Sequence, residues 1–133
     1  MIIKEIPKQE YNIALTIYNE CFNKNIKEIT IPLSGNLLGL YINNALIGLT
    51  QINYINNIME NKKQAIINSF CIKKEYQNKG YGNYFLNECI KYLKKKNINK
   101  INMTSNKNRT FAHRLYQKNN IEIIDTTLFN KNI

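Results

Sequence analysis

Apolar residues recur along the chain in two patterns, whose alternation predicts a mixed α/β fold. Helical spacing predicts helices over Lys8 to Phe22, Gly80 to Lys96 and Thr110 to Lys118. Segments rich in β-forming residues predict strands over Leu37 to Ile42, Ala45 to Ile55, Ala65 to Ile72, Lys100 to Thr104, Ile121 to Ile124 and Thr127 to Phe129. We therefore expect a mixed, mostly antiparallel sheet flanked by helices, in one domain that covers residues 1–133.

One stretch between a predicted strand and a predicted helix carries a binding signal. Gln77-Asn78-Lys79-Gly80-Tyr81-Gly82 follows the strand that ends at Ile72 and opens the next helix. The first N–H groups of a helix lack partners and carry partial positive charge, and glycine lets the backbone come close to a ligand. The stretch therefore predicts a site for a phosphate-bearing ligand.

Two common phosphate motifs do not fit this stretch. The dinucleotide pattern requires a third glycine where Phe85 stands, and the P-loop requires Lys and then Ser or Thr after its last glycine. The pattern that remains is Q-x-x-G-x-G. By itself, this pattern is also compatible with a plain turn in which two glycines join a strand to a helix.

Composition narrows the classes of protein to consider. The chain has no apolar run long enough to span a bilayer, and its N-terminus lacks the basic and apolar regions of a secretory signal. We therefore expect a cytoplasmic protein without a membrane segment. Cys21, Cys71 and Cys89 fit neither a disulfide framework nor a zinc site, so we expect buried free thiols.

The formal net charge of +10 indicates attraction to polyanions, such as coenzyme A, nucleic acid or acidic protein surfaces. A compositional bias towards Ile, Asn and Lys gives the same charge without any partner. The lysines are scattered, apart from Lys94-Lys95-Lys96 at a predicted helix end, where cations complement the helix dipole. The sequence has no stripe of Arg interleaved with aromatic residues, which argues against nucleic-acid binding.

A second motif lies downstream of the glycine stretch. Ala112, Leu115 and Tyr116, in the segment Arg109 to Ile121, match the pattern A-x-x-[LF]-Y-x-x-x-G-[FI], with Asn120 in place of the usual glycine. Asn is a good substitute for glycine at a left-handed helix end. Together with Q-x-x-G-x-G and the order of elements, this motif resembles the GNAT superfamily of N-acetyltransferases over nearly the whole chain.

The resemblance implies the GNAT fold and acetyl-CoA as the acetyl donor, with no metal. It implies that the donor's pyrophosphate binds backbone N–H groups at the helix start and that its pantetheine arm binds the end of the preceding strand, where the thioester carbonyl is also polarised. The first set comprises Gln77, Asn78, Lys79, Gly80, Tyr81, Gly82 and Asn83, and the second Phe70, Cys71 and Ile72.

The resemblance also implies roles for individual side chains. Tyr116 corresponds to the general acid that protonates the leaving thiolate, although a buried aromatic residue would also suit this position. Arg109 stands where many members have Asn, and it could contact the co-substrate or cap the helix. The surrounding segment looks like that of small-amine acetyltransferases, including the aminoalkylphosphonate type. Cys71 has no evident activating base, so a packed core thiol is expected rather than a nucleophile.

The general base is left open by the sequence. An ammonium substrate must lose a proton before it attacks, yet the predicted central strands contain no Asp or Glu. The candidates are Glu20, Glu28 and Glu60 on flanking elements, or water held by Asn68 and Ser69.

The leading hypothesis is acetyl transfer from acetyl-CoA to a primary amine by direct attack in a ternary complex. The acceptor would enter near Phe22 to Leu33, and it could be a small amine, an antibiotic, a polyamine or a protein amino group. The alternatives are a non-catalytic acyl-CoA-binding regulatory module and a basic nucleic-acid-binding protein. The strand expected over Thr127 to Phe129 could pair between two copies in a homodimer.

Overall fold

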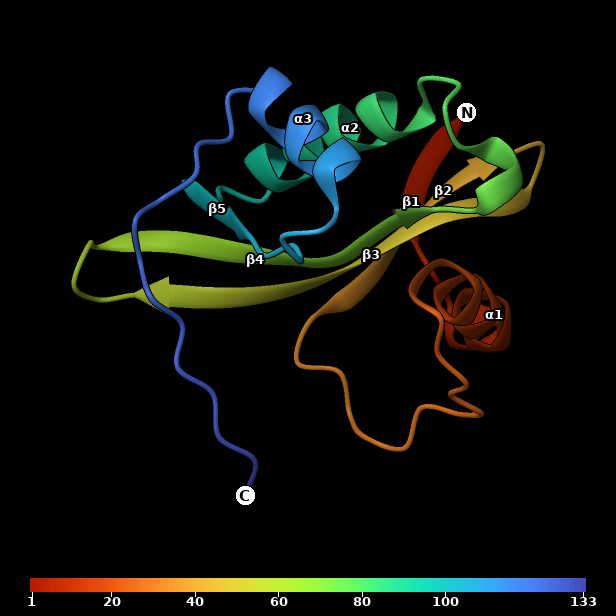
Figure 1. Ribbon diagram of the computed structural model, residues 1–133, viewed down its shortest axis with the longest axis horizontal. Helices are drawn as coiled ribbons and strands as arrows, with labels where there is room; N and C mark the ends of the chain where they lie inside the picture. The colour runs from red at the N-terminus through yellow and green to blue at the C-terminus, as the bar shows by residue number, and fades with distance from the viewer.

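The computed structural model describes residues 1–133, whose central feature is a five-stranded sheet in the order β1-β2-β3-β4-β5 (Figure 1). The first four strands pair antiparallel, and β5 joins β4 in parallel, so the sheet is mixed and mostly antiparallel, as predicted. The strands are β1 (Ile2–Glu5), β2 (Asn36–Ile42), β3 (Ala45–Asn57), β4 (Lys62–Ile72) and β5 (Lys100–Met103). The helices are α1 (Tyr11–Phe22), α2 (Tyr81–Lys95) and α3 (Thr110–Lys118), with short 3-10 turns at Lys8–Glu10 and Lys74–Tyr76.

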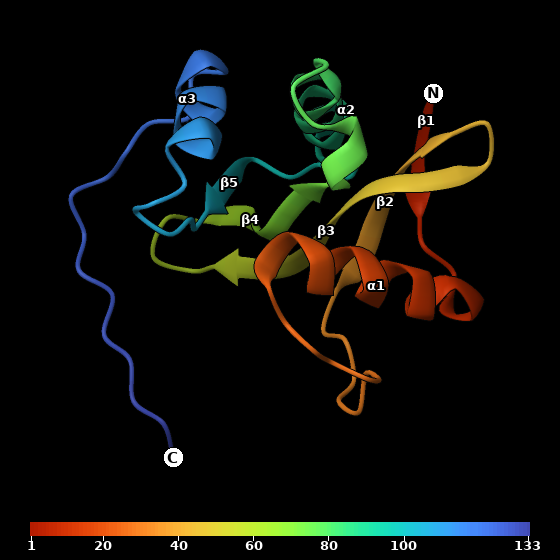
Figure 2. The ribbon, with the colours of Figure 1, turned by 45° about the vertical axis from the view of Figure 1, so that its right-hand side comes forward.

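Helices cover both faces of the sheet, with α1 across one face and α2 and α3 on the other (Figure 2). Each face has its own core because neighbouring residues of a strand point to opposite sides. Ile17 of α1 packs in a cluster with Leu49 and Cys71, whereas Phe85 of α2 packs in a cluster with Ile67. None of the helices has the length and apolar character that a membrane crossing requires.

Asparagine forms the tight turns between strands, as the sequence predicts. Asn43 and Asn44 join β2 to β3 with φ angles of 49° and 66°. These values fall in the left-handed region, which Asn tolerates better than other non-glycine residues. The next hairpin is longer than predicted, because polar residues of β3 and β4 continue to pair as far as Asn57 and Lys62.

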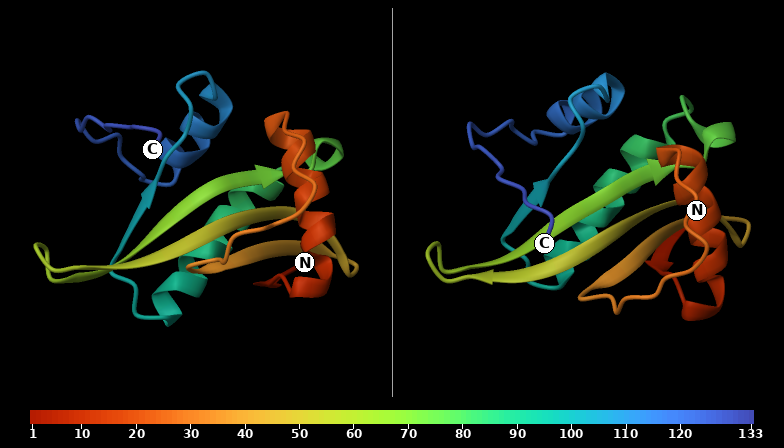
Figure 3. Two further views of the ribbon diagram at one scale, coloured as in Figure 1. Left: turned by 90° about the horizontal axis from the view of Figure 1, so that it is seen from below. Right: turned by 60° about the horizontal axis from the view of Figure 1, so that its bottom comes forward.

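The strands β4 and β5 pair only over part of their length. Their register runs from Gln64 opposite Lys100 to Ile67 opposite Met103, while β4 continues to Ile72. Beyond the paired part the chain diverges from β4 towards α3 (Figure 3). The last residues of β4 therefore have no partner strand on the β5 side.

A bulge in β4 lies at the start of this unpaired part. Leu49 faces Cys71 and Gln51 faces Asn68, so Thr50 of β3 faces two residues of β4. One of them, Ser69, has a φ of 51°. Such bulges bend a strand and re-aim its side chains. Here the bend occurs where β4 leaves its pairing with β5.

Two features of the sheet differ from the sequence-based prediction. The strand β1 was not predicted, because its four residues are mostly exposed and carry no alternating pattern. It forms by pairing with the buried strand β2. The strands predicted over Ile121 to Ile124 and Thr127 to Phe129 are wrong, because no strand forms there. Most side chains of this segment are exposed, such as Phe129 at 88%, so they bury too little apolar surface to hold a strand.

Two buried thiols predict a loss of stability at alkaline pH. The neighbouring Cys21 thiol and burial raise the pKa of the Cys71 thiol, and burial raises the pKa of Cys89. In the unfolded chain both thiols ionise near a pKa of about 8.5. The stabilisation of the folded state by these raised pKa values is therefore fully present below that pH and is lost as the pH rises above it. We expect the Cys89 thiol to lower the free energy of unfolding by about 1 kcal/mol between pH 8.5 and 9.5. The effect of Cys71 is partly offset, because its hydrogen bond lowers the pKa of the Cys21 thiol.

Urea unfolding under reducing conditions at these two pH values measures this loss. The matched variant Cys89→Val keeps an apolar side chain of similar size and removes one titrating group. The fall in its free energy of unfolding between the two pH values should be smaller than that of the wild-type protein by about 1 kcal/mol. An identical pH dependence in the variant and the wild-type protein would contradict the assignment to Cys89.

Candidate active site

The glycine stretch forms an open loop between β4 and α2. Its backbone turns through left-handed conformations at Asn78 and Gly80, whose φ angles are 61° and 88°. The Gln77 side chain donates to the carbonyl of Ile72 at 2.8 Å and thereby ties the loop to the end of β4. A Cβ atom on Gly80 would meet no other atom within 4 Å, so the loop leaves free space where a ligand can approach the backbone.

The start of α2 offers backbone donors to this space. The first bond across the helix start runs from the N–H of Tyr84 to the carbonyl of Gly80. The N–H groups of Tyr81, Gly82 and Asn83 are therefore those that a helix leaves without intrahelical partners. No acidic residue lies in the first turn of α2. This arrangement suits an anion such as a pyrophosphate.

The C-terminal half of α3 packs beside this helix start. A Cβ atom on Gly82 would lie 3.4 Å from Leu115, so the small residue allows α3 to approach α2 closely. The Asn119 side chain donates to the Asn83 side chain at 2.9 Å. The structure thus brings together the two motifs that the sequence separates by some thirty residues.

The end of β4 forms the floor of the site. Phe70, Cys71 and Ile72 are buried and have no partner strand on the side that faces β5. The carbonyl of Ile72 accepts from Gln77 and from the Cys21 thiol, and the carbonyl of Phe70 accepts from Arg109 at 3.4 Å. A strand end without a neighbouring strand can bind an extended ligand that adds to the sheet.

Tyr116 projects from α3 onto the same strand end. Only 7% of the residue is exposed, and its ring meets the Phe70 ring edge-on at 6.2 Å between centroids. Burial raises the pKa of the Tyr116 hydroxyl, while the nearby positive charge of Arg109 acts in the opposite direction. At neutral pH the phenol is therefore protonated and can donate a proton.

The Cys71 thiol is not suited to nucleophilic attack. It lies in the core on the α1 side of the sheet, and the neighbouring Cys21 thiol and burial raise its pKa. The reactive form of a cysteine is the thiolate, which this environment disfavours.

A cavity of about 550 Å³ opens on the α1 side of the unpaired part of β4. It is lined by residues from the end of α1, from β3 and β4, and from the segment between β5 and α3: Phe22, Gln51, Asn68, Ser69, Thr104, Ser105, Asn106 and Arg109. The lining is almost entirely polar and includes no carboxylate. The cavity is a candidate site for a second substrate, on the opposite face of the sheet from α2.

Gln51 is a lining residue that the sequence-based prediction missed. It follows Thr50 in the mostly apolar part of β3 from Leu46 to Ile52. A polar side chain at a central position of a sheet was the signal that could have identified it.

The three glutamates that the sequence offers as general bases all lie outside the lining of this cavity. Glu60 is at the tip of the β3–β4 hairpin, where both carboxylate oxygens accept from the Lys100 ammonium, at 2.8 and 2.9 Å. Glu28 is exposed in the loop after α1, and Glu20 lies in the last turn of α1. None of the three lines the cavity, whereas Asn68 and Ser69 do.

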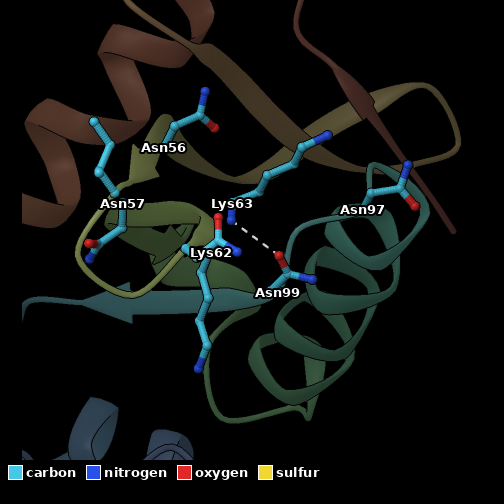
Figure 4. Close-up of a pocket in the computed structure, with 8 residues that line it drawn as sticks. Asn56, Asn57, Lys62, Lys63, Asn97 and Asn99 are labelled. Carbon is cyan, nitrogen blue, oxygen red and sulfur yellow. Dashed lines mark hydrogen bonds between the residues drawn. The ribbon is translucent and has the colours of Figure 1, made fainter.

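A second cavity, of about 480 Å³, lies at the other end of β4 (Figure 4). Asparagine and lysine side chains line it, and the Asn99 side chain accepts from the Lys63 N–H at 3.1 Å. The eleven residues of β4 place this cavity about 30 Å from the glycine loop. It therefore belongs to a separate region of the protein.

Comparisons with known proteins agree with this geometry. Residues 3–120 match the sequence model of the Acetyltransferase (GNAT) family. No curated protein sequence matches the chain.

Solved structures share the fold at low sequence identity. A protein described as a transcriptional regulator from Bacillus halodurans C-125 superposes with a TM-score of 0.84 at 14% identity, over 98% of this chain and 99% of that chain. An aminoglycoside acetyltransferase from an uncultured soil metagenomic sample gives 0.82 at 13% identity, over 99% and 95%. A ribosomal-protein-alanine N-acetyltransferase from Brucella melitensis biovar Abortus 2308 gives 0.81 at 9% identity, over 100% of both chains.

Proposed function

Because the chain belongs to the GNAT family of acetyltransferases, we propose that it transfers an acetyl group from acetyl-CoA to a primary amine within a ternary complex. The observation that carries this proposal is the meeting of three segments that are separate in the sequence. They are the glycine loop at the start of α2, the buried Tyr116 of α3 and the unpaired end of β4. Each supplies a function that transfer from an acyl-CoA requires.

The glycine loop and the end of β4 would hold the donor. The pyrophosphate would accept hydrogen bonds from the free N–H groups of Tyr81, Gly82 and Asn83, in the open space beside Gly80. The Lys79 ammonium, which donates to the Glu75 carbonyl at 3.1 Å, adds a positive charge to the same loop. The pantetheine arm would then run towards β4 and bind the backbone of Phe70, Cys71 and Ile72.

Transfer itself would be a direct displacement at the thioester. The neutral amine nitrogen attacks the carbonyl carbon, the new C–N bond forms, and the C–S bond breaks. The sulfur takes a proton from the hydroxyl of Tyr116, and the amine nitrogen gives up its extra proton to water. The Tyr116 phenolate then regains a proton from water. The buried environment of Tyr116 supports this role, because it keeps the phenol protonated until the thiolate develops.

The amine would lose its protons to water rather than to a carboxylate. Gln51, Asn68 and Ser69 line the cavity on the acceptor side and can hold ordered water by hydrogen bonds. No Asp or Glu lines that cavity. Catalysis would therefore depend on the fraction of acceptor that is already neutral.

A second candidate function is a non-catalytic acyl-CoA-binding regulatory module. The lack of a carboxylate in the cavity favours it, as does the shared fold with a protein described as a transcriptional regulator. In this function the glycine loop would bind the same ligand, but no acetyl group would be transferred.

Release of the free coenzyme A thiol in the presence of amines separates the two functions. We expect acetyl-CoA to be consumed with a kcat on the order of 10 per second for a good acceptor, because this is typical of enzymes. The panel should contain small amines, polyamines, aminoglycosides and peptides with free N-termini. Tight binding of coenzyme A, with no release of its thiol in the presence of any amine of the panel, would support the regulatory module instead.

A further inference from the structure

The cavity on the α1 side has an unbalanced positive charge. Of its eight lining residues, only Arg109 carries a charge, and no carboxylate faces it. The three ion pairs of the protein are Lys73–Glu75, Lys91–Glu88 and Lys100–Glu60, so the guanidinium of Arg109 has no carboxylate partner. Arg109 is partly buried, and an arginine in this state favours an anion from outside the protein.

The Arg109 side chain is held in position by two neutral contacts. One guanidinium nitrogen donates to the carbonyl of Phe70 at 3.4 Å, and the guanidinium lies over the Phe22 ring at 4.9 Å. These contacts orient the side chain without cancelling its charge. A guanidinium has five N–H donors in a planar fork, so enough donors remain to bind both oxygens of a carboxylate.

One polar group near Arg109 also lacks a hydrogen-bond partner. The Ser105 hydroxyl is buried and makes no hydrogen bond within the protein, although it belongs to a residue that lines the cavity. A buried hydroxyl of this kind is costly unless a ligand or water satisfies it. Thr104 and Asn106 supply further hydrogen-bonding side chains next to it.

The pyrophosphate of the donor is too far away to be the missing anion. The glycine loop lies beside the C-terminal end of α3, where Asn119 bonds to Asn83. Arg109 precedes the other end of this helix, whose nine residues span about 14 Å. The two positively charged regions therefore serve different ligand groups.

We propose that the acceptor is a small amine that also carries a carboxylate or a similar oxyanion, and that Arg109 binds this anion. The inference rests on the proposed function, because it names the acceptor of the same reaction. With the oxyanion on Arg109, the amine of the acceptor extends towards the end of β4 and the thioester. Polycationic acceptors are disfavoured, because they would face the Arg109 charge without any carboxylate to bind them.

Matched acceptors of different charge test this inference. A series of ω-amino carboxylates is compared with the corresponding ω-amino carboxamides and diamines of equal chain length, with thiol release as the measurement. We expect kcat/KM for the best carboxylate to exceed that of its matched carboxamide by about tenfold or more, as charge-assisted hydrogen bonds imply. The diamine should be the poorest acceptor of the three.

Substitutions at Arg109 link the preference to this residue. In Arg109→Gln the ratio between carboxylate and carboxamide should fall to near one, through a higher KM for the carboxylate. In Arg109→Lys part of the ratio should return, and in Arg109→Glu the diamine should become the best acceptor. The Michaelis constant for acetyl-CoA is measured in parallel, because a change confined to that constant would assign Arg109 to the donor and overturn the inference.

The outcomes for the inference and for the proposed function differ. Thiol release with carboxamides or diamines, but with no preference for carboxylates, would overturn the inference and leave acetyl transfer intact. A preference that survives in Arg109→Gln would also overturn it. Absence of thiol release with every member of the series would overturn acetyl transfer itself, and the inference with it.

Discussion

Replacing Tyr116 by Phe is expected to lower kcat for acetyl transfer by about 10²–10⁴-fold, the range that general acid catalysis contributes. The substitution removes only the hydroxyl, so the ring retains its edge-on contact with Phe70 and its place in the core. The donor binds elsewhere, at the glycine loop and along β4. Its dissociation constant should therefore change little while turnover falls.

Initial rates of thiol release and calorimetric titration with coenzyme A separate these two effects. Tyr92→Phe is a suitable control, because it also removes a tyrosine hydroxyl but at a distant position, where that hydroxyl donates to Glu5. The Tyr92→Phe variant should keep the kcat of the wild-type protein. Wild-type turnover in Tyr116→Phe would show that the leaving thiolate takes its proton from another group.

Replacing Gly80 by Glu is expected to weaken acetyl-CoA binding by about 10–100-fold more than replacing it by Gln. Both side chains add a Cβ atom at a φ of 88°, which costs about 1–2 kcal/mol for a residue other than glycine. Both also project into the open space beside the loop. Only Glu adds a negative charge close to the proposed pyrophosphate site, where like charges repel by a few kcal/mol.

Calorimetric titration of Gly80→Glu and Gly80→Gln with coenzyme A, at low and high salt, measures this difference. The gap between the two variants should narrow at high salt, because exposed charges are screened. Thermal unfolding of both variants checks that the backbone strain at position 80 lowers their stability equally. Equal affinities of the two variants at low salt would contradict a pyrophosphate site at the glycine loop.

Features with strong local signals could be predicted from the sequence. The turn at Asn43 and Asn44 requires left-handed backbone, and Asn is one of the few residues that adopt it. The loop at Gln77 to Gly82 combines a strand end, glycines and a helix start within a few residues. Family membership followed from this loop and the Tyr116 segment, since their pattern and order can be read without knowledge of the fold.

Features that depend on pairing between distant segments could not be predicted. The strand β1 forms only because β2 offers an edge, and the C-terminal residues from Ile121 onwards have β-forming composition but no partner. The bulge at Ser69 depends on register between β3 and β4. The cavity needs this bulge, the divergence of β5 and the end of α1 together, so Gln51 and Phe22 became its lining residues only in three dimensions.

Following an isotope label in the acetyl group is the most direct test of acetyl transfer. Acetyl-CoA with deuterium in the acetyl group is incubated with the protein and a mixture of primary amines, and the small molecules and the intact protein are analysed by mass spectrometry. Direct transfer predicts the label in an amide of one acceptor, in an amount equal to the free coenzyme A thiol, with no label on the protein. Label that remains entirely on acetyl-CoA, although coenzyme A binds, would contradict acetyl transfer to an amine.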